Sequence, residues 1–173
     1  GFREQFKSMP WISKPIKLGL DLSGGVHVVY EVQTKEAVKS RLQSTANGIR
    51  SLLRAQTVPI PVVRAGVVGG DTLEIVLIKD KYGATAREEI AKSYPDLSFV
   101  EQSTDESGRL SLKYNFSAAQ LQRTEDDAVS QAVETVRTRV DQFGLAEPLI
   151  QRQGDKRILL QVPGEKKVKK VKD

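Results

Sequence analysis

The sequence predicts an α+β fold in which long helices pack on one face of a mostly antiparallel sheet. Two long segments, 35–56 and 118–143, carry apolar residues at helical spacing, and short alternating segments typical of strands surround them. The order strand, long helix, hairpin occurs twice, over 26–78 and over 109–162. The core is expected to be mainly aliphatic, because 39% of the 173 residues are hydrophobic but only 6% are aromatic.

The first repeat opens on a strand at 18–33, in which apolar side chains fall on alternate positions from Val26 to Val32. Thr34 is the expected N-cap of the helix at 35–56, whose apolar residues recur every three or four positions. Two prolines end this helix. A hairpin then covers 62–78 and turns on the glycine pair at 69–70, since paired glycines favour tight hairpin turns.

A short helix at 85–94 and a strand at 97–102 are expected between the repeats. The second repeat starts with a strand at 109–116, which alternates most strictly in the whole chain. This alternation places Leu112 and Phe116 in the interior. Val28, Leu73, Ile75, Ile158 and Leu160 are the other positions that we expect inside.

The second long helix, at 118–143, is expected to begin with a capping box formed by Ser117 and Gln120. Gly144 suits the position just beyond its C-terminus. A hairpin at 148–162, turning at Gly154–Asp155, closes the repeat. Each βαββ repeat resembles part of a ferredoxin-like unit, which leads us to expect a duplicated ferredoxin-like fold.

The ends of the chain differ from its middle. Residues 1–17 mix aromatic and basic side chains around two prolines and are interpreted as a connector; 165–173 form a lysine-rich tail. That tail holds five lysines, so much of the net charge of +5 describes the tail and not a binding surface. No cysteine is present, which excludes disulfides and thiolate metal sites. No run reaches the length of a transmembrane helix.

Catalytic, metal and cofactor chemistry find little support in the sequence. His27 is the only histidine, and a lone histidine on the polar side of a strand is most often structural or solvated. No GxSxG motif is present, and neither glycine pair, at 24–25 or 69–70, fits a phosphate-binding loop. We therefore predict no enzyme activity, no cofactor and no metal site.

Binding of nucleic acid would require exposed aromatic side chains on the sheet for base stacking. Tyr114 and Phe116 share a face with Leu110 and Leu112, which indicates core positions. The lysine tail could attract phosphate, but it could equally be a solvated end. A nucleic-acid-binding ferredoxin-like module is thus an alternative reading, as is a ligand-sensing regulatory domain, and neither is favoured.

Two long motifs carry a family resemblance. Residues 18–25 read LGLDLSGG, and 139–164 read RVDQFGLAEPLIQRQGDKRILLQVPG. In order and spacing these resemble the SecD family of bacterial protein secretion, whose patterns are roughly LGLDLxGG and RVNxLGxxEPxIQRQGxxRIxVxLPG. Asp141, Phe143 and Val162 are mild departures. The resemblance extends over 18–164, although 58–108 contains no motif.

The resemblance implies that 18–164 form the ferredoxin-like base portion of the first periplasmic domain. It assigns no catalytic, cofactor-binding or metal residues. The matched positions are expected to be structurally important: Leu18, Gly19, Leu20, Asp21, Leu22, Gly24, Gly25, Gly144, Glu147, Pro148, Gln151, Arg152, Gln153, Gly154, Pro163 and Gly164.

The implied function is non-catalytic assistance to late-stage export of preproteins through the Sec channel, driven by the proton-motive force. The implied partners are SecF and the SecYEG channel, reached through a full-length protein with transmembrane helices, and unfolded preprotein is a further candidate. The implied location is the periplasmic side of the bacterial inner membrane, as a soluble fragment of a multi-pass membrane protein. No nucleic-acid partner is implied.

Overall fold

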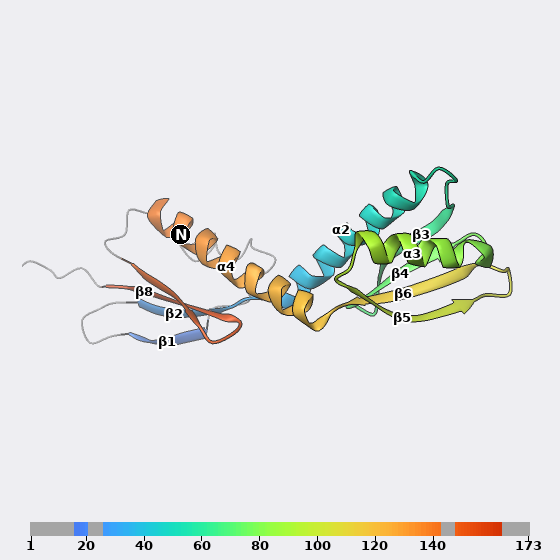
Figure 1. Cartoon of the computed structure of the whole chain (residues 1–173). Coiled ribbons are helices and arrows are strands. Elements are labelled where there is room, and N and C mark those ends of the chain that lie inside the picture. Colours follow the sequence, from blue (N-terminus) through green and yellow to red (C-terminus); the bar gives the residue numbers. More distant parts are fainter. Residues whose placement is uncertain (1–15, 21–25, 143–147, 164–173) are drawn as a thin grey trace, which may run out of the picture. The chain divides into compact units, whose positions relative to one another are not determined.

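A computed structural model describes residues 16–20, 26–142 and 148–163 of the chain (Figure 1). The chain forms two compact units. The terminal unit combines the described parts of Gly1–Thr34 and Asp126–Asp173, and the central unit is the continuous segment Lys35–Glu125. Both contain helix and antiparallel sheet, which confirms the predicted α+β class.

Most elements lie close to their predicted positions; β1 and η1 were not predicted as separate elements. In chain order they are β1 (Ile16–Leu20), β2 (Val26–Glu31), α2 (Thr34–Arg54), β3 (Val62–Val68), β4 (Thr72–Leu77), the 3₁₀ helix η1 (Asp80–Tyr82), α3 (Gly83–Ser93), β5 (Leu97–Thr104), β6 (Leu110–Phe116), α4 (Ala118–Gln142), β7 (Leu149–Gln153) and β8 (Arg157–Val162).

The strands form two four-stranded sheets, where the sequence led us to expect one. The terminal sheet has the order β1-β2-β8-β7 and the central sheet the order β3-β4-β6-β5, with all neighbours antiparallel. The reason is the choice of partners: β2 pairs with β8, and β4 pairs with β6. The two long helices, α2 and α4, therefore each lead from a strand of one sheet to a hairpin of the other.

The predicted duplication is present in the element order and is longer than expected. With β1 and β5 included, each repeat consists of two strands, a long helix and two further strands. Read from its other edge, the central sheet has the order β5-β6-β4-β3, which corresponds strand for strand to β1-β2-β8-β7. Each sheet thus joins the first hairpin of one repeat to the second hairpin of the other. The ferredoxin-like assignment itself stays a prediction.

The core of the central unit lies between its sheet and two helices. Figure 1 shows α2 and α3 on the same face of this sheet. The apolar stripe of α2 is buried there, as its spacing of three and four residues predicts. Its members are Val38, Leu42, Ala46, Ile49 and Leu53. They form one cluster with Leu73, Ile75 and Leu112 of the sheet, which are fully buried and were expected inside.

The core of the terminal unit lies between its sheet and the C-terminal part of α4. Four residues of α4 are buried against the sheet: Val129, Ala132, Val136 and Val140. Ile158 and Leu160 of β8 face them and are fully buried, as predicted. Val28 and Phe116, also expected inside, are partly buried against the terminal and central cores, respectively.

Local signals at the ends of elements are confirmed in two places. The Ser117 hydroxyl oxygen accepts a hydrogen bond of 3.2 Å from the backbone N–H of Gln120, so Ser117 caps α4. Gly69 and Gly70 both adopt positive φ in the β3–β4 turn. One element was predicted wrongly: the single strand expected over 18–33 is two strands, β1 and β2, which pair with each other antiparallel. β1 also begins at Ile16, inside the predicted connector 1–17. The tail 165–173 lies outside the described residues.

Candidate functional site

The C-terminal motif forms the β7–β8 hairpin, and Arg152 holds it in place. Its Nε donates a hydrogen bond of 3.0 Å to the Gly154 carbonyl, and its Nη2 donates one of 3.0 Å to the Asp155 carbonyl. The same Nη2 lies 2.6 Å from Oδ1 of Asp126 on α4. Gly154 has a φ of +66°, a conformation that glycine adopts without strain. Arg152 thus ties the turn to the helix of the terminal unit.

The other motif positions serve the same sheet. Leu18, Gly19 and Leu20 lie in β1, and Gln151 and Gln153 lie exposed in the edge strand β7. Pro148 precedes β7, and Pro163 follows β8. The structure therefore brings together Arg152 and Gly154 but no group of reactive side chains. The remaining motif residues lie outside the described part of the chain: Asp21, Leu22, Gly24, Gly25, Gly144, Glu147 and Gly164.

His27 takes part in a structural contact between neighbouring strands. Its Nδ1 lies 3.1 Å from Nε2 of Gln161, the residue directly opposite it on β8. Among the described residues no three His, Cys, Asp or Glu side chains gather where they could hold a metal ion. This contact is in keeping with the structural role expected for the histidine.

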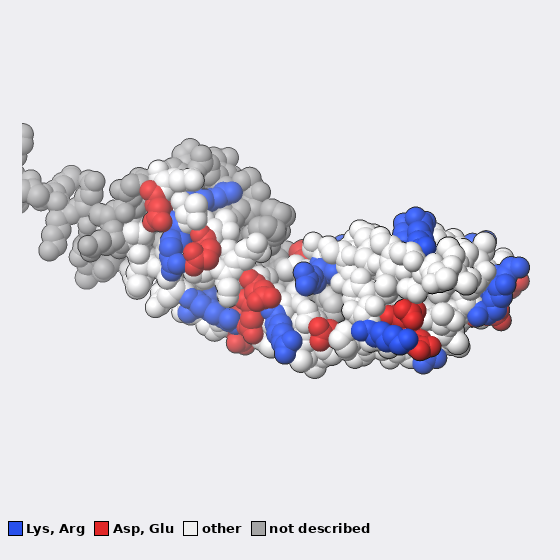
Figure 2. Space-filling model, turned by 45° about the horizontal axis from the view of Figure 1, so that its top comes forward, with Lys and Arg blue, Asp and Glu red and all other residues white. Residues whose placement is uncertain are grey.

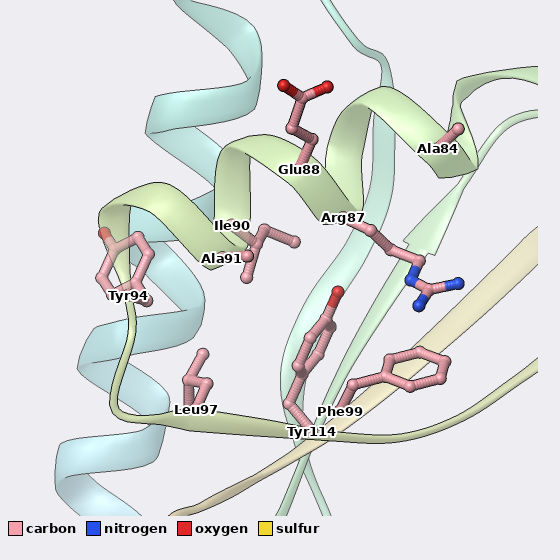
Figure 3. A pocket seen from close by; sticks show the side chains of 9 residues that line it. All are labelled: Ala84, Arg87, Glu88, Ile90, Ala91, Tyr94, Leu97, Phe99 and Tyr114. Carbon is pink, nitrogen blue, oxygen red and sulfur yellow. The ribbon is translucent and has the colours of Figure 1, made fainter.

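The central unit contains a pocket that the sequence did not reveal. It has a volume of about 430 Å³ and opens between α3 and the edge strand β5 (Figure 3). Its lining comes from α3, from the segment that follows α3, and from the inner face of β5 and β6. The lining residues are Ala84, Arg87, Glu88, Ile90, Ala91, Tyr94, Leu97, Phe99 and Tyr114. We call it the α3–β5 pocket.

Aromatic rings and one cation shape the α3–β5 pocket. The rings of Phe99 and Tyr114 meet edge to face, with centroids 5.6 Å apart and planes at 72°. The Arg87 guanidinium lies 4.2 Å from the centre of the Phe99 ring, within cation–π distance. The neighbouring charges of α3 do not neutralise Arg87, because Glu88 and Glu89 both pair with Lys92.

The hydroxyl of Tyr114 is buried and has no hydrogen-bond partner. Tyr114 is only 4% exposed, and Figure 3 shows its hydroxyl pointing away from the sheet toward the space beside α3. Burial raises the pKa of Tyr114 to about 12, while the positive charge of Arg87 acts in the opposite direction. The phenol is therefore a neutral donor at physiological pH, in a position where an unmade hydrogen bond is costly.

Two features of the sequence belong to the pocket, but neither of them alone indicates that a pocket is present. The alternation of 109–116 correctly placed Tyr114 inside. Phe99 and Val100, which are 40% and 50% exposed, form an apolar pair between Ser98 and Glu101 of β5. An apolar pair between polar residues of a strand could have indicated an exposed binding edge. The sequence does not show, however, that α3 lies beside this edge and completes the pocket.

The opposite face of the central sheet is polar and internally paired. The carboxylate of Glu74 on β4 binds Arg64 of β3 and accepts a 2.8 Å hydrogen bond from the Ser111 hydroxyl on β6. Lys113 of β6 lies 2.7 Å from Glu101 of β5. These side chains pair across neighbouring strands, whereas Oδ1 of Asn115, also on β6, is buried without a hydrogen-bond partner.

On the face seen in Figure 2, the described surface has no single dominant charge. Figure 2 shows Lys and Arg side chains interspersed with Asp and Glu side chains over the described part of the face in view. This face lacks the broad basic stripe typical of nucleic-acid-binding domains. Among the described residues, no helix combines the length and apolar character that a membrane span requires.

Two sequence families match the chain. The family described as "SecD/SecF GG Motif" matches residues 11–36, and "Protein translocase subunit SecDF, P1 domain, N-terminal" matches residues 129–173. These two matches nearly coincide with the two chain segments of the terminal unit, Gly1–Thr34 and Asp126–Asp173. The central unit therefore lies between them in the sequence.

Curated relatives match nearly the whole chain. A protein translocase subunit SecD of Pseudomonas aeruginosa is 37% identical over 161 residues, which are 89% of this chain and 25% of that protein. SecD of Calditerrivibrio nitroreducens is 36% identical over 88% of the chain and 29% of that protein, and SecD of Escherichia coli K12 is 36% identical over 88% and 24%. The chain spans 24–29% of the length of these three relatives.

Proposed function

Because this chain belongs to the SecD family of protein translocase subunits, we propose that it is a periplasmic part of a subunit that assists late-stage preprotein export. In this proposal the full-length protein works with SecF and the SecYEG channel and draws on the proton-motive force. The observation that carries the proposal is the similarity to SecD proteins over 88–89% of the chain.

The chain's own part in this function is mechanical and not catalytic. The terminal unit holds the two family-matched segments, 11–36 and 129–173, in one sheet. This is because β2 of the first segment pairs with β8 of the second. Proton movement in the membrane can drive a periplasmic element only if the states of that element differ in free energy. A sheet that ties both segments together is suited to transmit such a difference.

Arg152 supports this role. It connects the β7–β8 turn to α4 through two carbonyl groups and one carboxylate. The two carbonyl contacts fix Arg152 within the turn, and the contact with the Asp126 carboxylate joins the turn to the helix. We propose that the matched QRQG segment is kept for this mechanical coupling, and that the domain acts without cofactor or metal.

The test is an export experiment in cells. Residues 26–162 are deleted from the full-length parent gene, and the export of a labelled preprotein is followed by pulse-chase. We expect precursor to persist late in export, while the parent protein still inserts in the membrane at its normal level. Normal export kinetics with the deleted protein present at full level would refute the proposal.

A further inference from the structure

The edge of the central sheet at β5 is open to a further strand. β5 pairs only with β6 among the described strands, and it is eight residues long. The backbone N–H of Asp105 donates to the Arg109 carbonyl on the side of β6. The backbone N–H and C=O groups of every second residue before Asp105 therefore also face β6. The backbone groups of Gln102 and Thr104 consequently face outward, where another strand could pair with them.

The protection that edge strands usually carry is slight here. β5 contains neither lysine nor proline, and its single charge, Glu101, is paired with Lys113. One irregularity is present, a register shift between Phe99 and Glu101. Such a bulge interrupts long, regular pairing with another sheet, but it leaves room for a short extended segment.

The α3–β5 pocket lies on the helix side of this same edge. Phe99 and Leu97 of β5 form one wall, and Ile90 and Ala91 of α3 form the other. A strand added outside β5 would project every second side chain toward this space. The pocket volume of about 430 Å³ accommodates a large apolar side chain.

Two hydrogen-bond donors accompany the apolar walls. The Tyr114 hydroxyl is buried without a partner, and the Arg87 guanidinium lies over the Phe99 ring at an exposed position of α3. The buried hydroxyl calls for an acceptor oxygen from outside the unit, and the exposed guanidinium can donate to the same acceptor. A peptide carbonyl is such an acceptor, and it occurs at fixed spacing from an apolar side chain along an extended backbone.

We propose that the groove between α3 and β5 binds an extended segment of unfolded polypeptide, which pairs with the outer edge of β5 and inserts an apolar side chain into the α3–β5 pocket. A polypeptide uses all three features at once: the open edge, the apolar pocket and the hydrogen-bond donors. A small apolar ligand would leave the edge unused. The inference rests on the proposed function, in which a translocase subunit meets its substrate unfolded.

The probe is a nine-residue peptide, capped at both ends, in which serine alternates with leucine and phenylalanine. Binding to the complete 173-residue chain is measured by amide chemical shifts. We expect saturable shifts that concentrate in α3, β5 and Tyr114. The matched control peptide has the same side chains but carries N-methyl groups along one edge, and it should bind about tenfold more weakly. Equal binding of both peptides, or shifts elsewhere, would overturn the proposal.

Two variants locate the site. Ala91→Trp fills the pocket from an exposed position of α3, and it should weaken peptide binding about tenfold. Its control, Thr85→Trp, adds the same side chain at an exposed position of α3 outside the pocket and should bind as the unaltered chain does. Gln102→Pro removes an outward N–H at the edge and should also weaken binding. Unchanged binding in Ala91→Trp and Gln102→Pro would refute the inference.

The outcome separates this inference from the proposed function. If export requires residues 26–162 but the peptide does not bind, the groove proposal fails and the proposed function stands. If the peptide binds in the groove but export is normal without the region, the proposed function fails and the groove remains a peptide site.

Discussion

A methyl group at Gly48, in the middle of α2, tests how tightly the segment after α3 packs on that helix. An added Cβ would overlap with the hydroxyl oxygen of Tyr94, while the ring carbon Cζ would lie at an ordinary 3.5 Å. The conflict is therefore confined to a single oxygen atom. Tyr94 also lines the α3–β5 pocket, so this contact fixes one wall of the proposed binding site.

The expected effect is the sum of two opposing contributions. Replacing an interior helical glycine by alanine stabilises a helix by about 1 kcal/mol. Overlap with a packed side chain costs about 2 kcal/mol. Gly48→Ala should therefore lower the free energy of unfolding by about 1 kcal/mol. In a Tyr94→Phe background the oxygen is gone, and the same substitution should raise the free energy by about 1 kcal/mol.

The assay is urea unfolding of the four proteins of this double-mutant cycle, followed by amide signals of the central unit. The account predicts a change of sign and a coupling energy of about 2 kcal/mol between the two positions. A stabilising Gly48→Ala in the presence of Tyr94 would refute the reasoning. So would an effect of Gly48→Ala that is the same in both backgrounds.

Three further predictions concern the two units. Arg152→Ala should lower the free energy of unfolding by about 1–2 kcal/mol, and Asp126→Ala should lower it less. The partly exposed ion pair between the two side chains contributes under about 1 kcal/mol, and the two hydrogen bonds from Arg152 to carbonyl groups contribute the rest. Equal losses for the two variants in urea unfolding would contradict this. Burial raises the pKa of Tyr30 and Tyr114 from 10.0 to about 12, so folding favours the neutral phenols. The free energy of unfolding should be at its full value below pH 10 and fall by about 2 kcal/mol per tyrosine as the pH rises toward 12. In unfolding curves recorded over this pH range, phenylalanine at either position should remove that residue's share of the fall. The fragment 35–125 should fold alone, with a cooperative thermal transition and dispersed amide signals, because the central sheet and its core cluster lie wholly within it. Amide signals typical of a disordered chain would contradict the division into units.

The extents of the helices and strands were predictable because local patterns determine them. The alternation of Leu110, Leu112 and Tyr114 corresponds to buried positions of β6, and the spacing along α2 corresponds to its buried stripe. The Ser117 cap was predictable for the same reason, because its partner is three residues away.

The division into two sheets was not predictable, because strand pairing joins distant segments. An alternating pattern shows which face of a strand is buried, but it does not show which strand is the partner, such as β6 for β4. The separation of β1 from β2 was missed, because the apolar positions of 18–33 are compatible with one strand and only the pairing of β1 with β2 shows two.

The candidate sites show the same limit. The motif singled out Arg152, but its partner Asp126 lies 26 residues away, and only the fold shows that the two meet. The α3–β5 pocket needed Arg87, Phe99 and Tyr114 to come together from three elements. None of these residues belongs to a motif, so sequence reasoning passed over them.

The most direct test of the central claim is the rate of late-stage export under a proton gradient. A preprotein is halted partway through the channel in membrane vesicles, a gradient is imposed, and completion is followed by protection from protease. The account predicts that the gradient accelerates completion with the intact parent protein and fails to do so when residues 26–162 are deleted. An equal acceleration with and without these residues would contradict it.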